Sequence, residues 1–167
     1  MLIKSKLKNI FLFSIIFQYL FISFSFSEII KSFDIQGNDR VSKETIIMFS
    51  NLKIGETLNQ NKLNEALKEL YYTDYFKNVK IKSNNNVVKI VVKENPIIQQ
   101  ILIKGIEKNR IKEQLEEITS KIEKYPFVES KINEKTNLLK NILKSFGYYF
   151  VELKTSINTN QNNTVDL

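Results

Sequence analysis

The 167-residue sequence contains no cysteine and no histidine, and it has only four glycines and two prolines. Without cysteine the chain has neither disulfides nor a thiol nucleophile, so packing alone must hold the fold together. Without histidine it lacks the commonest general base and the side chain that most often binds transition metals. These absences argue against an enzyme and against a metalloprotein.

Carboxylate pairs are the remaining candidates for acid–base chemistry. Glu116 with Glu117, and Glu65 with Glu69, lie on polar helix faces with lysines nearby, which is typical of a solvated surface. The sequence shows no phosphate loop, nucleophile elbow or metal-ligand spacing. We therefore predict no enzymatic activity, no cofactor and no metal.

Residues 1–27 have the three parts of a secretory signal peptide. Three lysines form a positive head, and residues 10–24 are almost wholly apolar. Ser25 and Ser27 then provide small side chains at positions −3 and −1 of a cleavage before Glu28. The alternative is an uncleaved anchor helix, for which this apolar run is short. We expect an exported chain whose fold begins at residue 28.

The net charge of +7 falls to +4 without the three lysines of the signal segment, which contains no acidic residue. A mild excess of lysine with no basic cluster is typical of a solvated surface. It is a poor indication of a nucleic-acid partner, and we predict none.

The rest of the sequence consists of one strand–helix–helix–strand–strand pattern that occurs twice. In the first copy, alternating apolar residues predict a strand over residues 29–35, followed by a turn at Gly37. Ser42 is expected to cap a short helix. Gly55 then breaks the chain.

Asn59 or Asn61 is expected to cap the longer second helix of this copy. Its apolar stripe has the helical period of 3.6 residues and consists of Leu63, Ala66, Leu67, Leu70 and Tyr71. Two strands follow, over residues 76–82 and 88–92, in which apolar residues alternate with lysines. Residues 83–86 are expected to form the hairpin turn.

The second copy repeats this order. A strand over residues 97–104 ends at Gly105, which stands 68 positions after Gly37. The long helix of this copy gains four residues, about one turn, so its apolar face returns to the same side before Gly147 ends it. A strand is expected over Tyr149–Thr155. The sequence then ends inside the expected last strand, so we expect that strand to be incomplete.

The pattern predicts the α+β fold class, with two small domains that each pack two helices on one face of a three-stranded mixed sheet. The expected boundaries are a signal peptide at 1–27, a first domain at 28–95 and a second domain at 96–167. Pro96 marks the joint because it lacks an N–H and interrupts strand pairing. The expected turn and hinge positions are Gly37, Gly55, Pro96, Gly105 and Gly147.

Several segments resemble the POTRA domain, and the two copies together resemble the periplasmic start of the BamA family of outer-membrane assembly factors. The segments that carry the resemblance are Ile35–Val41, Lys53–Leu58, Leu67–Tyr71, Tyr75–Val79 and Val91–Pro96. Two departures are Asp74, where a glycine usually closes the long helix, and Glu123–Pro126, where a glycine-containing turn is common. Family members continue into further POTRA domains and a membrane β-barrel, so the resemblance implies a fragment or a truncated gene.

The resemblance implies a periplasmic scaffold at the outer membrane of a Gram-negative-type bacterium. Its expected partners are unfolded outer-membrane proteins, accessory lipoproteins of the assembly complex and, through a missing C-terminal barrel, the membrane. The expected mechanism is β-augmentation, in which an extended chain pairs with a free sheet edge. The alternatives are the POTRA domains of a two-partner secretion transporter or of an anchored cell-division protein.

The candidate sheet edges are the strands that follow the long helix in each copy. Lysines on the first edge are expected to guide acidic partners, although lysines at a sheet edge also prevent aggregation. The candidate partner-binding residues are Phe76, Lys77, Val79, Lys80, Ile81 and Lys82 on the first edge, and Tyr149, Phe150, Val151 and Leu153 on the second.

Overall fold

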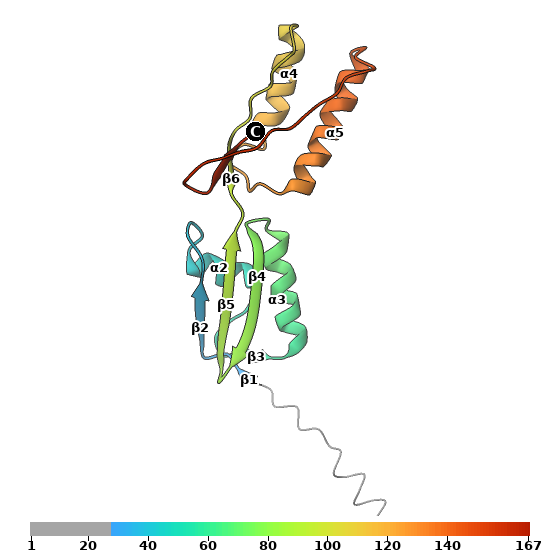
Figure 1. The fold of residues 1–167 in the computed structure, drawn as a ribbon. Helices are drawn as coiled ribbons and strands as arrows, with labels where there is room; N and C mark the ends of the chain where they lie inside the picture. The colour runs from blue at the N-terminus through green and yellow to red at the C-terminus, as the bar shows by residue number, and fades with distance from the viewer. Residues whose placement is uncertain (1–27) are drawn as a thin grey trace, which may run out of the picture.

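The computed structural model describes residues 28–167, so the predicted signal peptide at residues 1–27 lies outside the described residues. Two α+β units stand end to end, and the chain passes between them where β5 (Val87–Glu94) leads into β6 (Ile97–Gln100) (Figure 1). We call residues 28–94 the N-terminal unit and residues 97–167 the C-terminal unit.

The N-terminal unit has a mixed sheet of three strands in the order β2-β5-β4. The central strand β5 is parallel to β2 and antiparallel to β4. A second, two-stranded antiparallel sheet pairs β1 with β3. The other elements of this unit are β1 (Glu28–Ile29), β2 (Ser32–Gln36), α2 (Lys43–Ser50), β3 (Thr57–Leu58), α3 (Gln60–Tyr72) and β4 (Phe76–Asn84).

One face of this sheet is buried against the two helices. Val88, Ile90 and Val92 of β5 pack in one core cluster with Ile46 of α2 and Leu70 of α3. Lys89 and Lys93, on the opposite face of β5, are exposed. The alternation along β5 therefore places the helices on a single face, as the sequence predicted.

Both predicted helix caps are present in the N-terminal unit. The Ser42 hydroxyl accepts a hydrogen bond of 3.2 Å from the Thr45 N–H, and Asn59 Oδ1 accepts one of 2.9 Å from the Lys62 N–H. Each such cap stabilises its helix by about 1 kcal/mol. Of the two asparagines that the sequence offered for α3, the structure selects Asn59.

The first predicted strand, over residues 29–35, is divided in the structure. Ile30 is buried, and its N–H and C=O bond to Glu56 and Gly55 rather than to β5. Residues 30 and 31 therefore separate β1 from β2, and only β2 joins the three-stranded sheet. The backbone groups of Ile30 therefore bond to the turn around Gly55 and not to the three-stranded sheet.

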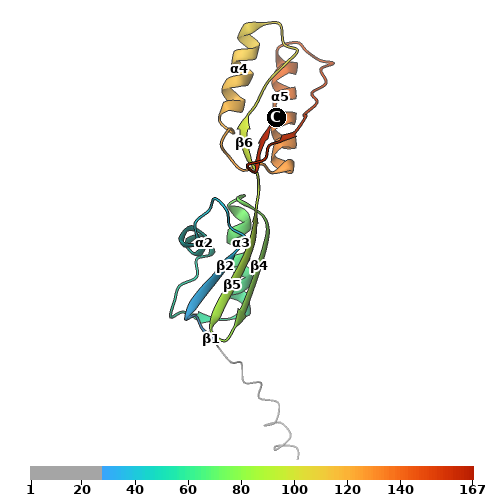
Figure 2. The same ribbon diagram turned by 60° about the vertical axis from the view of Figure 1, so that its left-hand side comes forward.

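The C-terminal unit repeats the plan with a smaller sheet, in the order β6-β8-β7 (Figure 2). Strand β8 is parallel to β6 and antiparallel to β7. The α+β fold class with mixed three-stranded sheets is thus confirmed in both units. The remaining elements are α4 (Asn109–Ser120), α5 (Glu129–Ser145), β7 (Asn158–Thr159) and β8 (Thr164–Asp166).

Helix α5 has 17 residues and α3 has 13, which agrees with the four-residue insertion seen in the sequence. Gly147, at φ 93°, ends α5. Its N–H bonds to the carbonyl of Lys144, and the N–H of Tyr148 bonds to that of Leu143. This pair of bonds is a Schellman motif.

The predicted strand at Tyr149–Thr155 is wrong. These residues are irregular, and the edge strand is β7, at Asn158–Thr159. A strand forms only where it can pair with a neighbouring strand. β8 has three residues, and two of them already pair with β7, so no pairing edge is left for Tyr149–Thr155. Val151 and Leu153 pack instead against the cluster of Ile111, Leu115 and Leu143. For the same reason β6 ends at Gln100 rather than at residue 104.

Candidate functional site

Strand β4 is the longest strand of the described chain and lies at an edge of its sheet. It has nine residues and pairs on one side only, with β5. The first half of the predicted site, from Phe76 to Lys82, therefore lies on a free strand edge. Such an edge presents a row of backbone donors and acceptors.

The hairpin turn determines which residues of β4 direct these groups outward. Asn85 and Asn86, at φ 52° and 66°, form a two-residue turn that the pair Asn84–Val87 closes. The closing pair of such a turn is hydrogen-bonded, and bonded pairs then recur at every second residue. Residues 84, 82, 80 and 78 consequently face β5, whereas residues 83, 81 and 79 direct N–H and C=O away from it. The register shifts between Phe76 and Asn78, so the alternation ends there.

Tyr71, in the last turn of α3, supports this assignment and covers one outward position. The N–H of Val79 donates a hydrogen bond of 3.1 Å to the Tyr71 hydroxyl. The ring is partly exposed, at 41%. Tyr71 belongs to the apolar stripe predicted for α3, but no pattern in the sequence indicates its contact with Val79.

The side chains of β4 divide between the core and solvent. Phe76 and Val79 are buried and Ile81 is half-buried against the same core. Lys77, Lys80 and Lys82 are exposed. Because the apolar side chains point into the unit, an incoming strand would meet mainly backbone groups along the edge, with lysines beside them.

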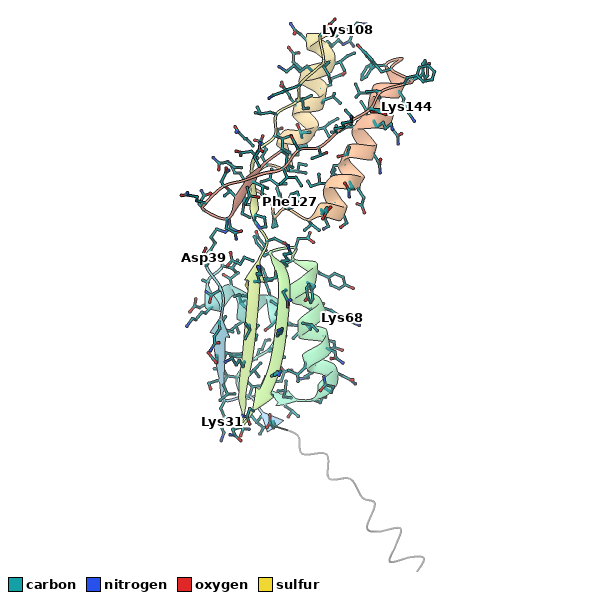
Figure 3. All side chains as sticks on the ribbon, viewed as in Figure 1. Lys31, Asp39, Lys68, Lys108, Phe127 and Lys144 are labelled. Atoms are coloured by element: carbon teal, nitrogen blue, oxygen red, sulfur yellow. The ribbon has the colours of Figure 1, made fainter. Side chains whose placement is uncertain are left out.

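The second half of the predicted site does not lie on a sheet edge. Tyr149 and Phe150 are 70% and 100% exposed, in the turn after α5. They follow Tyr148, whose ring lies 5.9 Å from the Lys108 ammonium. Figure 3 shows Lys108 and Lys144 at the end of the C-terminal unit that is remote from the N-terminal unit. The structure therefore separates these aromatics from β4.

Glu94, at the end of β5, is the best-connected side chain where the two units meet. One carboxylate oxygen accepts the N–H groups of Asp39, Arg40 and Val41 at 2.8–3.0 Å. The other lies 3.3 Å from Nε of Arg40. Burial opposes ionisation of Glu94, but these donors together with Arg40 outweigh it and hold the pKa of the carboxyl below its usual value.

Arg40 also joins the two units. Its guanidinium donates to the carbonyl of Asn95 at 2.7 Å and to that of Asn163, in the C-terminal unit, at 2.9 Å. On the other side of the joint, Lys131 of α5 forms an ion pair with Asp74. The Asn95 side chain donates to the Asp74 carbonyl at 2.7 Å. The segment that leads to Pro96 is thus held by contacts from both units.

Asp74 is the residue that replaces the expected glycine after α3. It has φ 62°, in the left-handed region, so aspartate adopts here the conformation that glycine adopts at Gly147. Its backbone carbonyl and its carboxylate both make contacts at the joint. The departure from the usual pattern therefore coincides with contacts between the units.

Residues 28–167 contain neither a metal-ion site nor a membrane-spanning helix. No group of three or more carboxylates is placed to hold a metal ion. No helix in this range is long and apolar enough to cross a membrane.

The sequence family POTRA, described as a surface antigen variable number repeat, matches residues 28–95. The outer membrane protein assembly factor BamA of Neorickettsia risticii (strain Illinois) is 29% identical over 83 residues, which is 50% of this chain and 11% of that protein. BamA of Neisseria meningitidis serogroup B is 23% identical over 141 residues, which is 83% of this chain and 18% of that protein. The chain therefore spans less than a fifth of these relatives.

Two solved structures share the fold. POTRA1-2 of the periplasmic domain of Omp85 from Anabaena matches with a TM-score of 0.50 and 15% identity, covering 83% of this chain and 91% of that one. The N-terminal domain of Omp85 from Thermosynechococcus elongatus matches with a TM-score of 0.56 and 12% identity, covering 83% and 60%. The family match over residues 28–95, the two relatives and the shared fold together support a POTRA region of a BamA-type protein.

Proposed function

We propose that this chain is a periplasmic scaffold in the assembly of outer-membrane proteins and that it binds extended client segments by strand addition to β4. The relatives named as assembly factors support the first part of this proposal. The nine-residue free edge of β4 supports the second. Accessory lipoproteins are the further partners of this scaffold, and the two units act as separate domains that meet at Asn95–Pro96.

The free backbone of β4 is the observation that carries the mechanism. The outward groups at residues 79, 81 and 83 can pair with a chain of any sequence, because backbone groups are common to all residues. Clients that share no sequence motif can therefore use the same edge. The apolar face of the sheet and the lysines beside the edge add a preference for strands with one apolar and one polar face.

A peptide with the sequence of Val87–Glu94 is a suitable probe because β5 already pairs antiparallel with β4. On the outer edge, copies of Val88, Ile90 and Val92 would lie opposite the outward residues, with their side chains on the helix face. N-methylation of those three amides is expected to weaken binding at least about tenfold, since three backbone bonds of roughly 0.5–1.5 kcal/mol each are lost. Fluorescence anisotropy of the labelled peptide measures the affinity.

The matched control is the same peptide with N-methyl groups on the copies of Lys89, Val91 and Lys93. These amides point away from β4 in the proposed register, so this peptide is expected to keep the affinity of the parent. Equal weakening by the two methylation patterns would contradict strand addition. Absence of binding by the unmethylated parent would contradict the proposed use of β4.

The Tyr71 hydroxyl occupies a donor that an incoming strand needs. Tyr71→Phe frees the N–H of Val79 and is expected to tighten binding of the parent peptide about fivefold, the factor that corresponds to the ~1 kcal/mol of one net hydrogen bond. Tyr72→Phe is the control, because Tyr72 is the neighbouring tyrosine and is 75% exposed. Unchanged affinity in Tyr71→Phe would show that the hydroxyl does not compete with the client.

A further inference from the structure

A groove of about 640 Å³ lies where the two units meet, at the end of the β4 edge. Phe76 and Lys77, at the start of β4, form one wall. Ile157 and Thr159, at the edge of the second sheet, form another. Phe127 and Val128, just before α5, add apolar side chains, and Lys93 and Glu129 add charged ones. Ile157 is 47% exposed.

The edge strands β4 and β7, one from each sheet, run in the same direction on the two sides of this groove. β5 continues through Pro96 into β6 in the same direction (Figures 1 and 2). β4 is antiparallel to β5, and β7 is antiparallel to β8, which is parallel to β6. β4 and β7 therefore run in the same direction, each as the edge strand of its own sheet.

The groove lies at the start of β4 and at the end of β7. The turn that follows β7 is tied to the N-terminal unit, because the carbonyl of Asn163 accepts a hydrogen bond of 2.9 Å from the Arg40 guanidinium. This contact holds the end of the second edge beside the beginning of the first. An extended chain that is antiparallel to β4 would leave that strand at Phe76 and next reach Thr159.

We propose that the groove receives the C-terminal continuation of a client segment bound to β4 and directs it to β7, so that the two units bind one long extended chain. This inference rests on the proposed use of β4. The occupant is an unfolded polypeptide with alternating apolar residues. Its apolar side chains fit the walls formed by Ile157, Phe127 and Val128, and its path is continuous with the β4 edge.

The polarity of the path makes the inference testable. The nine residues of β4 span about 30 Å at ~3.3 Å per residue. All eight residues of the peptide therefore lie along this strand, and none extends into the groove. A C-terminal extension of an antiparallel peptide passes into the groove. An N-terminal extension passes Asn84 and leaves the protein at the opposite end of the sheet.

The experiment uses the 167-residue chain and three labelled peptides. The first is the eight-residue copy of Val87–Glu94. The other two carry four additional residues, Thr-Val-Thr-Val, at the C-terminus or at the N-terminus of that peptide. The C-terminal extension is expected to lower Kd about tenfold, equivalent to ~1.4 kcal/mol, and the N-terminal extension is expected to leave it unchanged. Equal effects of the two extensions would overturn the groove while leaving the use of β4 intact. No binding by any peptide would overturn the proposed function itself.

A variant in the groove wall separates the groove from the strand edge. Ile157→Glu is expected to abolish the gain from the C-terminal extension and to leave the affinity of the eight-residue peptide unchanged. Ile54→Glu, at a 68% exposed isoleucine outside the groove lining, is expected to leave both values unchanged. A full gain retained in Ile157→Glu would contradict the proposal.

A second copy of this chain is the competing occupant. Sedimentation equilibrium of the wild-type chain and of Ile157→Glu tests for it. We expect a monomer in both cases at the concentrations of the peptide titration. A wild-type dimer that Ile157→Glu dissociates would assign the groove to self-association and overturn the client path.

Discussion

Glu94→Ala is expected to lower the free energy of unfolding of the N-terminal unit by about 3 kcal/mol, the sum of three net hydrogen bonds of ~1 kcal/mol each. The Glu94 side chain is 3% exposed, and its loss leaves three N–H groups of residues 39–41 without their acceptor and removes one of the contacts of the Arg40 guanidinium. Since small domains are only marginally stable, this change is large enough to unfold the unit.

Glu94→Gln is the informative comparison because it keeps one carbonyl oxygen. The three N–H groups bond to a single oxygen of Glu94, so the amide can retain them and lose only the charge and the contact with Arg40. We expect a loss of about 1–2 kcal/mol, roughly half that of alanine. Urea unfolding followed by circular dichroism measures both variants. Equal effects of the two substitutions would show that the charge, rather than the acceptor, holds the loop.

The pH dependence of stability has a definite sign here. The pKa of Glu94 in the folded chain lies below the ordinary value of 4.5. The stabilisation by this carboxylate is therefore present above pH 4.5 and is lost as the pH falls through the lower pKa of the folded protein. Glu94→Gln should remove this part of the acid sensitivity, so its deficit relative to wild type should shrink between pH 5 and the acid limit, a window set by the ordinary carboxyl pKa of ~4.5. A deficit that is constant with pH would contradict the assignment.

Gly37→Ala is the second substitution with a large expected effect. Gly37 follows β2 at φ 78°, and a Cβ atom there would lie 2.2 Å from the backbone carbonyl oxygen of Val92. The left-handed conformation costs a residue with a side chain ~1–2 kcal/mol, and the overlap with a strand backbone adds ~1–3 kcal/mol. We expect a loss of about 3 kcal/mol in the free energy of unfolding.

Gly55→Ala is the matched control for this position. Gly55 has a similar φ of 85°, but a Cβ atom there would meet nothing within 4 Å. Its replacement should therefore cost only the conformational part, ~1–2 kcal/mol. If thermal unfolding gave equal losses for the two variants, the close approach of Gly37 to β5 would have no energetic role.

The candidate site could be predicted only in part, because half of it depends on which strands find partners. For Phe76–Lys82, alternation of apolar residues and lysines indicated a half-buried strand, and the structure places that strand at a sheet edge. The residues Tyr149–Thr155 alternate in a similar way, yet they are irregular. Periodicity describes a local preference for extended backbone, whereas pairing requires a second strand that is distant in the sequence.

The sequence by itself determined the succession of helices, the Ser42 cap, the α+β class and the extra turn of α5, since these depend on neighbours within a few residues. Tertiary structure alone decided that Tyr71 covers the Val79 N–H, that Glu94 holds the loop at residues 39–41, and that the two sheet edges meet at one groove. The contacts of Tyr71 and Glu94 join residues 8 and 53 to 55 positions apart. A hydrogen bond over such separations leaves no periodic trace in the sequence, because it depends on how the elements pack rather than on how each one forms.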